Sequence, residues 1–278
     1  MIMKFGCFSL DFRRFSLDTA FQMAHRYGFD GIEVWGGRPH AYPYDMDEKE
    51  VKHILELKRK YTLEVPMYTP NALGMPYNLC SLDQRERRDA IHYFKAAIRA
   101  CEAIEAPRML IVADHPGYEV SRKDAYRRFI ENMIELGEYA KQYCVKLVIE
   151  ALTPMESPVI TTADDCVAVI EDIGLSNIEA MMDVVPPVIA YEPLSAYFNK
   201  LGDRLNYIHL CNNDRRTDAH LRLDSGQLPV QDMLKVFRKH DFKGYVTVEL
   251  YSECYSDPEV LLANSARILN CIRDELDR

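Results

Sequence analysis

Residues 146–152 read KLVIEAL, and residues 178–184 read IEAMMDV. Both are short, mostly apolar runs of strand length, and they flank a longer segment of helical period. Six more runs of this kind occur along the chain, at 3–9, 31–35, 63–69, 108–113, 205–211 and 244–250. Strands that alternate with helices require right-handed parallel crossovers. Eight such units of roughly 35 residues predict an α/β fold, a (β/α)8 barrel with outer helices.

An open, doubly wound sheet is the alternative arrangement of eight parallel strands. The first predicted strand-to-helix loop carries no Gly-x-Gly-x-x-Gly sequence, and no Walker-type phosphate loop is present. The chain has 278 residues with no composition break or long linker, and α/β barrels commonly reach about 250 residues as one unit. We therefore expect a single barrel domain over residues 1–278.

Helix starts are marked by three capping-box patterns, at 47–50, 81–84 and 121–124. The segment 185–200 is the weakest connector, because its three prolines allow only a short helix before the seventh strand.

Composition excludes several classes of protein. The formal net charge is -9, from 34 basic and 43 acidic residues, which opposes binding to a nucleic-acid backbone. No apolar run of about 18 residues and no charged-then-apolar leader occurs, so we expect a cytoplasmic protein without a membrane partner. The eight cysteines form no Cys-x-x-Cys pair, which predicts reduced thiols that fill the core: Cys7, Cys80, Cys101, Cys144, Cys166, Cys211, Cys254 and Cys271.

An ionisable side chain is embedded in or near the end of each of the last four apolar runs, namely Glu150, Asp183, His209 and Glu249. Taken alone, each has an ordinary explanation as a salt-bridge partner or a hydrogen-bonded core residue. In a closed barrel, however, the strand ends converge on one mouth, and no four Lys or Arg residues occupy matching positions. Three carboxylates and one imidazole form a ligand set for one divalent cation, with Mn²⁺, Co²⁺ or Mg²⁺ favoured and Zn²⁺ or Fe²⁺ open.

The same four residues resemble the metal site of the sugar isomerase/epimerase superfamily, which has a xylose isomerase-like TIM barrel. The Glu-x5-Glu pattern of ketose 3-epimerases is matched by Glu150 and Glu156, and their His-x5-Arg pattern by His209 and Arg215. Similarity to the fructoselysine 3-epimerase group spans nearly the whole chain and is carried by the stretches 28–42, 68–78, 150–157, 197–205 and 244–250.

This resemblance implies an isomerase, a metal-dependent ketose 3-epimerase acting on fructoselysine and psicoselysine through a cis-enediolate. Epimerisation at C3 needs two bases on opposite faces of that carbon, and Glu150 and Glu249 fit those roles. A divalent cation stabilises the negative charge of the enediolate. Free-ketose 3-epimerases usually have a histidine three residues after the metal-binding aspartate. Pro186 stands there instead, which counts against an unmodified free ketose.

Six further residues are candidate substrate contacts, each with an ordinary structural alternative as a core, capping or surface residue. They are Arg215, Glu156, Trp35, Tyr68, His115 and His40. We expect them to line a pocket for a small sugar, and a homo-oligomer is also compatible with the sequence.

Other functions remain open at this point. An epimerase of free ketoses or ketose phosphates, or an aldose–ketose isomerase, would use the same enediolate chemistry. A metal-dependent DNA-repair endonuclease on this barrel is disfavoured, since it typically needs more histidines and a basic groove. The chain has only eight histidines, and four of them fall in predicted helices. A non-catalytic sugar-binding barrel is the third class.

Overall fold

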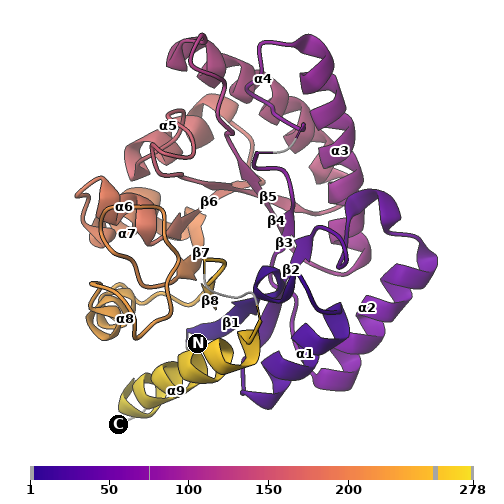
Figure 1. Ribbon diagram of the computed structural model, residues 1–278. Coiled ribbons are helices and arrows are strands. Elements are labelled where there is room, and N and C mark those ends of the chain that lie inside the picture. Colours follow the sequence, from indigo (N-terminus) through magenta and orange to yellow (C-terminus); the bar gives the residue numbers. More distant parts are fainter. Residues whose placement is uncertain (1–2, 75, 253–255, 277–278) are drawn as a thin grey trace.

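Eight parallel strands close into a barrel, in the order β1 to β8, with β8 pairing back onto β1 (Figure 1). The structure is a computed structural model and describes residues 3–74, 76–252 and 256–276. This architecture confirms the predicted (β/α)8 barrel. The strands are β1 (Lys4–Phe8), β2 (Gly31–Gly36), β3 (Tyr68–Pro70), β4 (Arg108–Val112), β5 (Lys146–Glu150), β6 (Ile178–Asp183), β7 (Leu205–Leu210) and β8 (Tyr245–Val248).

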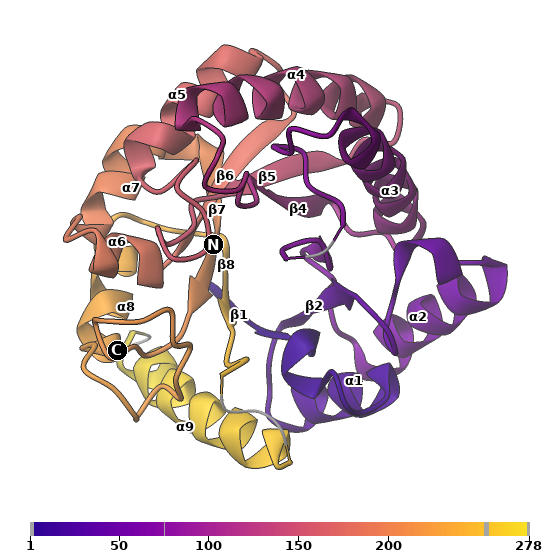
Figure 2. The same cartoon turned by 45° about the horizontal axis from the view of Figure 1, so that its top comes forward.

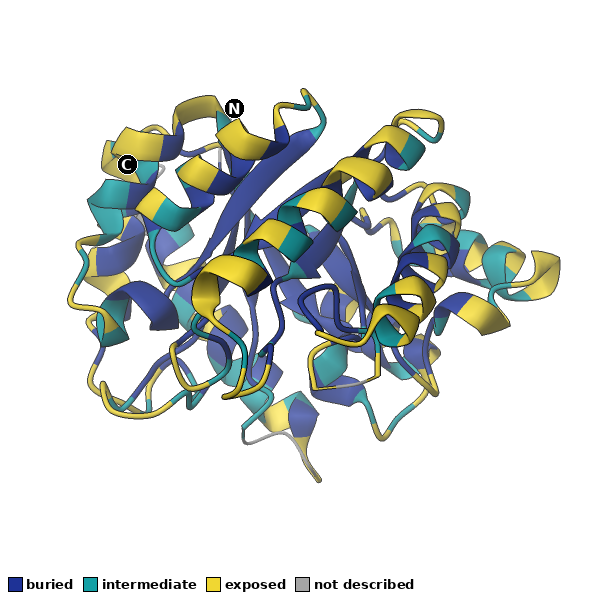
Figure 3. Cartoon of the chain, turned by 90° about the horizontal axis from the view of Figure 1, so that it is seen from above, coloured by how far each residue is buried: buried dark blue, intermediate teal, exposed yellow. Residues whose placement is uncertain are grey.

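Helices form the outer layer around the strands (Figure 2). They are α1 (Leu17–Arg26), α2 (Glu48–Tyr61), α3 (Gln84–Ala103), α4 (Arg122–Lys141), α5 (Ala163–Ile173), α6 (Val185–Ile189), α7 (Leu194–Leu201), α8 (Val230–Lys239) and α9 (Pro258–Leu276), with short 3-10 turns η1 (Ser9–Phe12), η2 (Pro43–Asp45) and η3 (Gly202–Arg204). Figure 3 shows buried strands inside helices whose outer faces are exposed. That the residues 1–278 make a single domain stays a prediction.

The third strand is shorter and later than the sequence predicts. The expected run was 63–69, whereas β3 begins at Tyr68. Pro66 explains the difference, because proline has no N–H to donate to a ladder. The neighbouring strand instead donates to carbonyls on either side of this proline, from Ile32 N to Glu64 O and from Val34 N to Met67 O.

The predicted helix starts are correct at two of three places. Asp47 accepts hydrogen bonds from the first turn of α2, and Ser121 does the same for α4. The prediction of a start at Ser81 is wrong, because Asp83 is the N-cap of α3. The prediction of one short helix in 185–200 is also wrong. The prolines there stand in the first turn of α6 and at the N-cap of α7, where no N–H is needed, so two helices form.

The interior of the barrel explains where the polar strand residues point. A small cluster of buried residues on six strands and strand ends is separate from the larger core, and it consists of Met67, Leu110, Val148, Met181, Tyr207 and Tyr245. Side chains two positions apart on a strand share a face. Glu150, Asp183 and His209 each follow a member of this cluster by two positions. They therefore stand directly above it, toward the carboxyl ends of the strands.

The thiols mostly fill the core, as the sequence predicts. All the described cysteines are free, and most are buried, but Cys144 and Cys271 are exposed. Cys144 lies in the turn after α4, and Cys271 lies on the exposed face of α9. Cys254 lies outside the described residues. No helix in the described ranges has the length and apolar character needed to cross a membrane.

Candidate functional site

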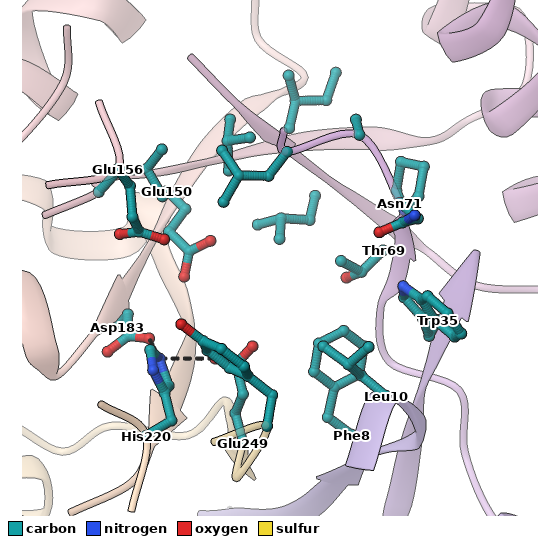
Figure 4. A pocket seen from close by; sticks show the side chains of 18 of the residues that line it. Phe8, Leu10, Trp35, Thr69, Asn71, Glu150, Glu156, Asp183, His220 and Glu249 are labelled. Carbon is teal, nitrogen blue, oxygen red and sulfur yellow. Dashed lines mark hydrogen bonds and ion pairs between the residues drawn. The ribbon is translucent and has the colours of Figure 1, made fainter. Parts of the chain in front are cut away.

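A cavity of about 270 Å³ opens at the carboxyl ends of the strands (Figure 4). Every strand, or the loop that follows it, contributes to the wall, as expected for the mouth of such a barrel. The wall consists of Phe8, Leu10, Trp35, Thr69, Pro70, Asn71, Ala72, Leu73, Phe94, Leu110, Ile111, Val112, Glu150, Ala151, Leu152, Glu156, Asp183, Pro186, Asp218, His220, Glu249 and Tyr251.

The structure brings the four predicted metal ligands together at this mouth. Glu150, Asp183 and His209 each offer one ligand atom, and these atoms lie within 4.8 Å of one another. Glu249, the residue directly after β8, places its Oε2 3.0 Å from Nδ1 of His209, and Oε1 of Glu150 lies 3.4 Å from the same nitrogen. All four side chains are buried. Their role as metal ligands stays a prediction.

The imidazole of His209 is oriented by a carboxylate on the opposite side of its ring. Nε2 of His209 lies 2.8 Å from Oε2 of Glu33 on β2, and a carboxylate can only accept, so Nε2 carries the proton. Thr69 donates its hydroxyl to the other oxygen of Glu33 and fixes that carboxylate in turn. A histidine held in this way presents Nδ1 to the carboxylates of Glu150 and Glu249, which is the arrangement of a metal-ligating histidine with its supporting carboxylate.

The free ring nitrogen provides a test of whether a cation fits. Nδ1 of His209 is buried and makes no hydrogen bond in the described structure, although two carboxylate oxygens face it. Burial alone would lower the pKa of His209, but the negative charges of Glu33 and Glu249 raise it well above its usual value. A cation held at this point would take the place of the extra proton. The donor set of three carboxylates and one imidazole therefore fits a divalent ion.

A second histidine, His220, completes the acidic wall. Its Nε2 lies 2.8 Å from Oδ2 of Asp183 and 3.4 Å from Oε2 of Glu249. Its ring packs against Tyr251 at 4.6 Å, and Ser252 accepts its backbone N–H. Asp183, Cys211 and His220 form a further group whose ligand atoms lie within 4.8 Å of one another. His220 thus holds two of the predicted ligands in place.

The loop after β7 carries His220 into the cavity by folding back on itself. Asn212 and Leu221 exchange backbone hydrogen bonds of 2.9 and 2.8 Å as an antiparallel bridge. The side chain of Asn212 accepts from the backbone N–H of Leu228 and donates to the carbonyl of Leu223. This bridge sets His220 beside Cys211 at the end of β7.

The two glutamates proposed as acid and base have different electrostatic surroundings. Burial raises the pKa of Glu150 to about 7, and the neighbouring carboxylates of Asp183 and Glu249 act in the same direction. Burial would also raise the pKa of Glu249, but His209 and His220 outweigh it and lower that pKa below its usual value. The protein frame alone therefore gives the two carboxyl groups different proton affinities, with Glu150 the more readily protonated of the two.

Two predicted substrate contacts, Glu156 and Trp35, do line the cavity. Oε2 of Glu156 accepts from both the backbone N–H and the hydroxyl of Thr153 at 3.0 Å. Trp35 is the penultimate residue of β2, and the loop after the strand packs on its indole, with the ring of His40 at 5.7 Å. Gly37 is required there, because a Cβ would lie 2.1 Å from that indole.

The remaining four predicted contacts do not line the cavity in the described structure. Tyr68 is fully buried and donates to the carbonyl of Ala41. His40 supports Trp35 from behind, and its Nε2 faces the carbonyl of Phe15. Tyr68 has the core position that was its structural alternative, whereas His40 is buried and not the surface histidine that was its alternative. Substrate binding by either residue stays a prediction.

The other two of these four lie on loops outside the wall. His115 packs against the exposed Tyr118 at 4.7 Å, and its Nδ1 accepts from the backbone of Gly117. Arg215 is exposed on the loop after β7, with a left-handed backbone at φ 64°. Substrate binding by either residue stays a prediction.

Sequence reasoning missed three polar residues that build the site. Glu33 interrupts the run GIEVW in the same manner as the four residues that were found, so the signal was present in the sequence. His220 and Asp218 lie within a charged loop. A loop has no regular alternation of apolar and polar residues, so nothing in the sequence distinguishes these two from solvent-exposed neighbours.

Known proteins resemble this chain in sequence and in structure. The sequence matches the xylose isomerase-like TIM barrel family over residues 21–271. Fructoselysine 3-epimerase of Shigella flexneri is 33% identical over 276 residues, covering 99% of this chain and 100% of that protein. Among solved structures, D-psicose 3-epimerase with D-tagatose from Clostridium cellulolyticum H10 has a TM-score of 0.81 at 15% identity over 98% of each chain. The IOLI protein with a bound zinc atom has a TM-score of 0.81 at 14% identity, covering 97% of this chain and 98% of that one.

Proposed function

From its membership of the xylose isomerase-like TIM barrel family, we propose the reaction of this chain, which is an isomerase related to the ketose 3-epimerases. The chain inverts C3 of fructoselysine and psicoselysine with one divalent cation. The observation that carries the proposal is that Glu150, Asp183 and His209 bring ligand atoms within 4.8 Å of one another, while Glu249 lies 3.0 Å from Nδ1 of His209. Buried carboxylates that meet in this way need a cation or protons to balance their charge.

Glu150, Asp183, His209 and Glu249 would hold the cation. When bound, a divalent ion stabilises the negative charge that develops on the oxygens at C2 and C3. The protein supplies the rest of the site. Glu33 and His220 fix the orientation of the ligands, and the closed barrel below keeps water away from their inner side.

The proton transfer is assigned to Glu150 and Glu249. They come from β5 and from the end of β8, and both point into the same part of the cavity from different directions (Figure 4). One carboxylate removes the proton from C3 and leaves the enediolate. The other, protonated as a carboxylic acid, then donates its proton to the opposite face of C3, and the roles reverse for the reverse reaction.

The residue at position 186 favours a ketose modified at C1 over an unmodified one. Pro186, which replaces the histidine usual in free-ketose 3-epimerases, lines the cavity in the first turn of α6 and offers no donor. The 33% identical relative is named for fructoselysine. The specific metal, homo-oligomerisation and a cytoplasmic location stay predictions.

The test is a substrate panel in deuterated water with protein reloaded with Mn²⁺, Co²⁺ or Mg²⁺. Fructoselysine, psicoselysine, fructose, psicose and tagatose would be compared by NMR of the C3 configuration. We expect inversion and deuterium at C3, fastest with fructoselysine and psicoselysine, and no turnover after chelation. Deuterium at C1 or C2 would instead identify an aldose–ketose isomerase, and cleavage of abasic DNA would identify an endonuclease.

A further inference from the structure

The charged groups on the cavity wall are acidic apart from one histidine. Five carboxylates line it, and no Lys or Arg side chain does so among the residues that the structure describes. Three of the carboxylates, Glu150, Asp183 and Glu249, belong to the proposed cation site. Glu156 and Asp218 remain, and neither is needed to hold that cation. A wall with this excess of negative charge opposes a phosphorylated substrate and favours a cationic one.

Asp218 has one carboxylate oxygen that the protein leaves unsatisfied. Its Oδ2 accepts the hydroxyl of Tyr251 at 2.9 Å. Its Oδ1 is buried and has no hydrogen-bond partner in the described structure. An acceptor that is removed from water without a partner is costly, so such a group in a cavity indicates a donor that arrives with the ligand.

Glu156 has the same division between a fixed oxygen and an open one. Thr153 donates twice to Oε2, whereas Oε1 makes no hydrogen bond within the described ranges. Burial raises the pKa of Glu156 to about 8, and the charge of Asp218 is the next largest cause. Both carboxyl groups line the same cavity, so a positively charged group bound between them would be attracted to both.

We infer that Asp218 and Glu156 form an anionic subsite that binds the secondary ammonium group on C1 of a ketosamine substrate. A secondary ammonium carries one positive charge and two N–H donors, one for each open carboxylate oxygen. The C1 hydroxyl of a free ketose supplies one donor and no charge. The inference rests on the proposed function and deepens it, since it names the residues that select an amine-bearing ketose.

The test compares Asp218→Asn and Glu156→Gln with the wild type on fructoselysine and on psicose. Asparagine and glutamine keep one oxygen for the hydrogen bonds from Tyr251 and Thr153. They replace the open, charged acceptor oxygen with an amide NH2, which cannot accept from the ammonium. Loss of a charge-assisted hydrogen bond predicts a fall in kcat/KM for fructoselysine of about ten- to hundredfold. We expect a much smaller change with psicose, so that selectivity for the amine falls at least about tenfold. Asp214→Asn is the matched control, since Asp214 lies on the same loop but not on the cavity wall, and its selectivity should equal that of the wild type.

Calorimetric affinity for fructoselysine provides a readout that does not depend on turnover. Weaker binding to the Asp218→Asn protein, with unchanged binding to the Asp214→Asn protein, supports the subsite. Suppose that the wild type epimerises both substrates. If the two variants then lose kcat/KM equally on fructoselysine and psicose, the subsite is overturned and the proposed function stands. If the wild type inverts no ketose, the proposed function is wrong. The subsite is wrong as well if the wild type and the Asp218→Asn protein then bind fructoselysine with equal calorimetric affinity.

Discussion

The half of the cavity built from β5 to β8 carries all five of its carboxylates, whereas the half built from β1 to β4 carries apolar and neutral side chains. Figure 4 shows the two halves facing each other, with Glu150, Glu156, Asp183, His220 and Glu249 opposite Phe8, Leu10 and Trp35. Thr69 and Asn71 are the polar groups on the apolar half, and both are uncharged.

The difference separates two tasks within one barrel. The acidic half can hold a cation and move protons, since it groups ionisable side chains around one point. The apolar half can pack against the carbon skeleton of a substrate and exclude water, which strengthens the electrostatic interactions opposite. Glu33 connects the halves, because it stands on β2 and orients His209 on β7.

The largest effect is expected on the acidic half. Glu150→Gln and Glu249→Gln should each lower kcat for epimerisation by about 10²- to 10⁴-fold, because each removes one partner of the proton transfer. If the two-base assignment is right, each variant exchanges the C3 proton of only one epimer with deuterated solvent. Glu171→Gln, an exposed change on α5, serves as the control. Inversion at a normal rate in either cavity variant would contradict the assignment.

The next effect concerns the residue that connects the halves. In the Glu33→Gln protein, the side-chain amide has one oxygen, so it cannot accept hydrogen bonds from His209 and Thr69 on two separate oxygens as the carboxylate does. We expect the affinity for the activating divalent ion to fall about ten- to a hundredfold, the usual loss when a supporting partner is removed. A titration of activity against Mn²⁺ measures this, and excess Mn²⁺ should restore kcat. Activity lost at every Mn²⁺ concentration would show a different role.

A carboxyl buried behind the apolar half should make stability depend on pH. Asp11 in η1 accepts from the backbone N–H of Leu250, and burial raises its pKa to about 8. The folded protein therefore holds a proton that the unfolded chain loses near pH 4, and the stability from this group is lost as pH rises from about 4 to 8. Asp11→Asn should gain up to about 4 kcal/mol relative to the wild type between pH 5 and pH 8.5, at about 1.4 kcal/mol per pH unit up to the folded pKa. Urea unfolding at both values measures the difference, and parallel curves would contradict the shift.

The smallest effect is expected on the apolar half. Trp35→Phe keeps an aromatic wall but shortens it, so KM for fructoselysine should rise several-fold while kcat stays within about twofold, as expected for a contact of about 1 kcal/mol. Steady-state kinetics separate the two parameters. A large fall in kcat with unchanged KM would place Trp35 among the groups that act on the reaction itself.

Sequence reasoning recovered the barrel and the four converging residues because both are encoded locally. Glu150 and Asp183 end apolar strands, and the alternation of side chains along a strand fixes the face they share. Glu33 carries the same local signal, but its role depends on His209, 176 residues away along the chain. The later start of β3 depended on Pro66, which cannot donate to a strand ladder. The two helices in 185–200 depended on prolines that fit the first turn of α6 and the N-cap of α7.

The amino-acid sequence by itself determined where strands and helices form, which strand faces are apolar, and which four ionisable side chains stand at strand ends. Only the tertiary structure decided which of the remaining charges meet them. Closure of β8 onto β1 brings the first and last strands together, and the bridge between Asn212 and Leu221 turns His220 and Asp218 inward while Arg215 stays outside. The physical reason is separation along the chain. Periodicity and turn chemistry act between residues a few positions apart, whereas the spacing of charges across the cavity follows from closure of the barrel and folding of its loops.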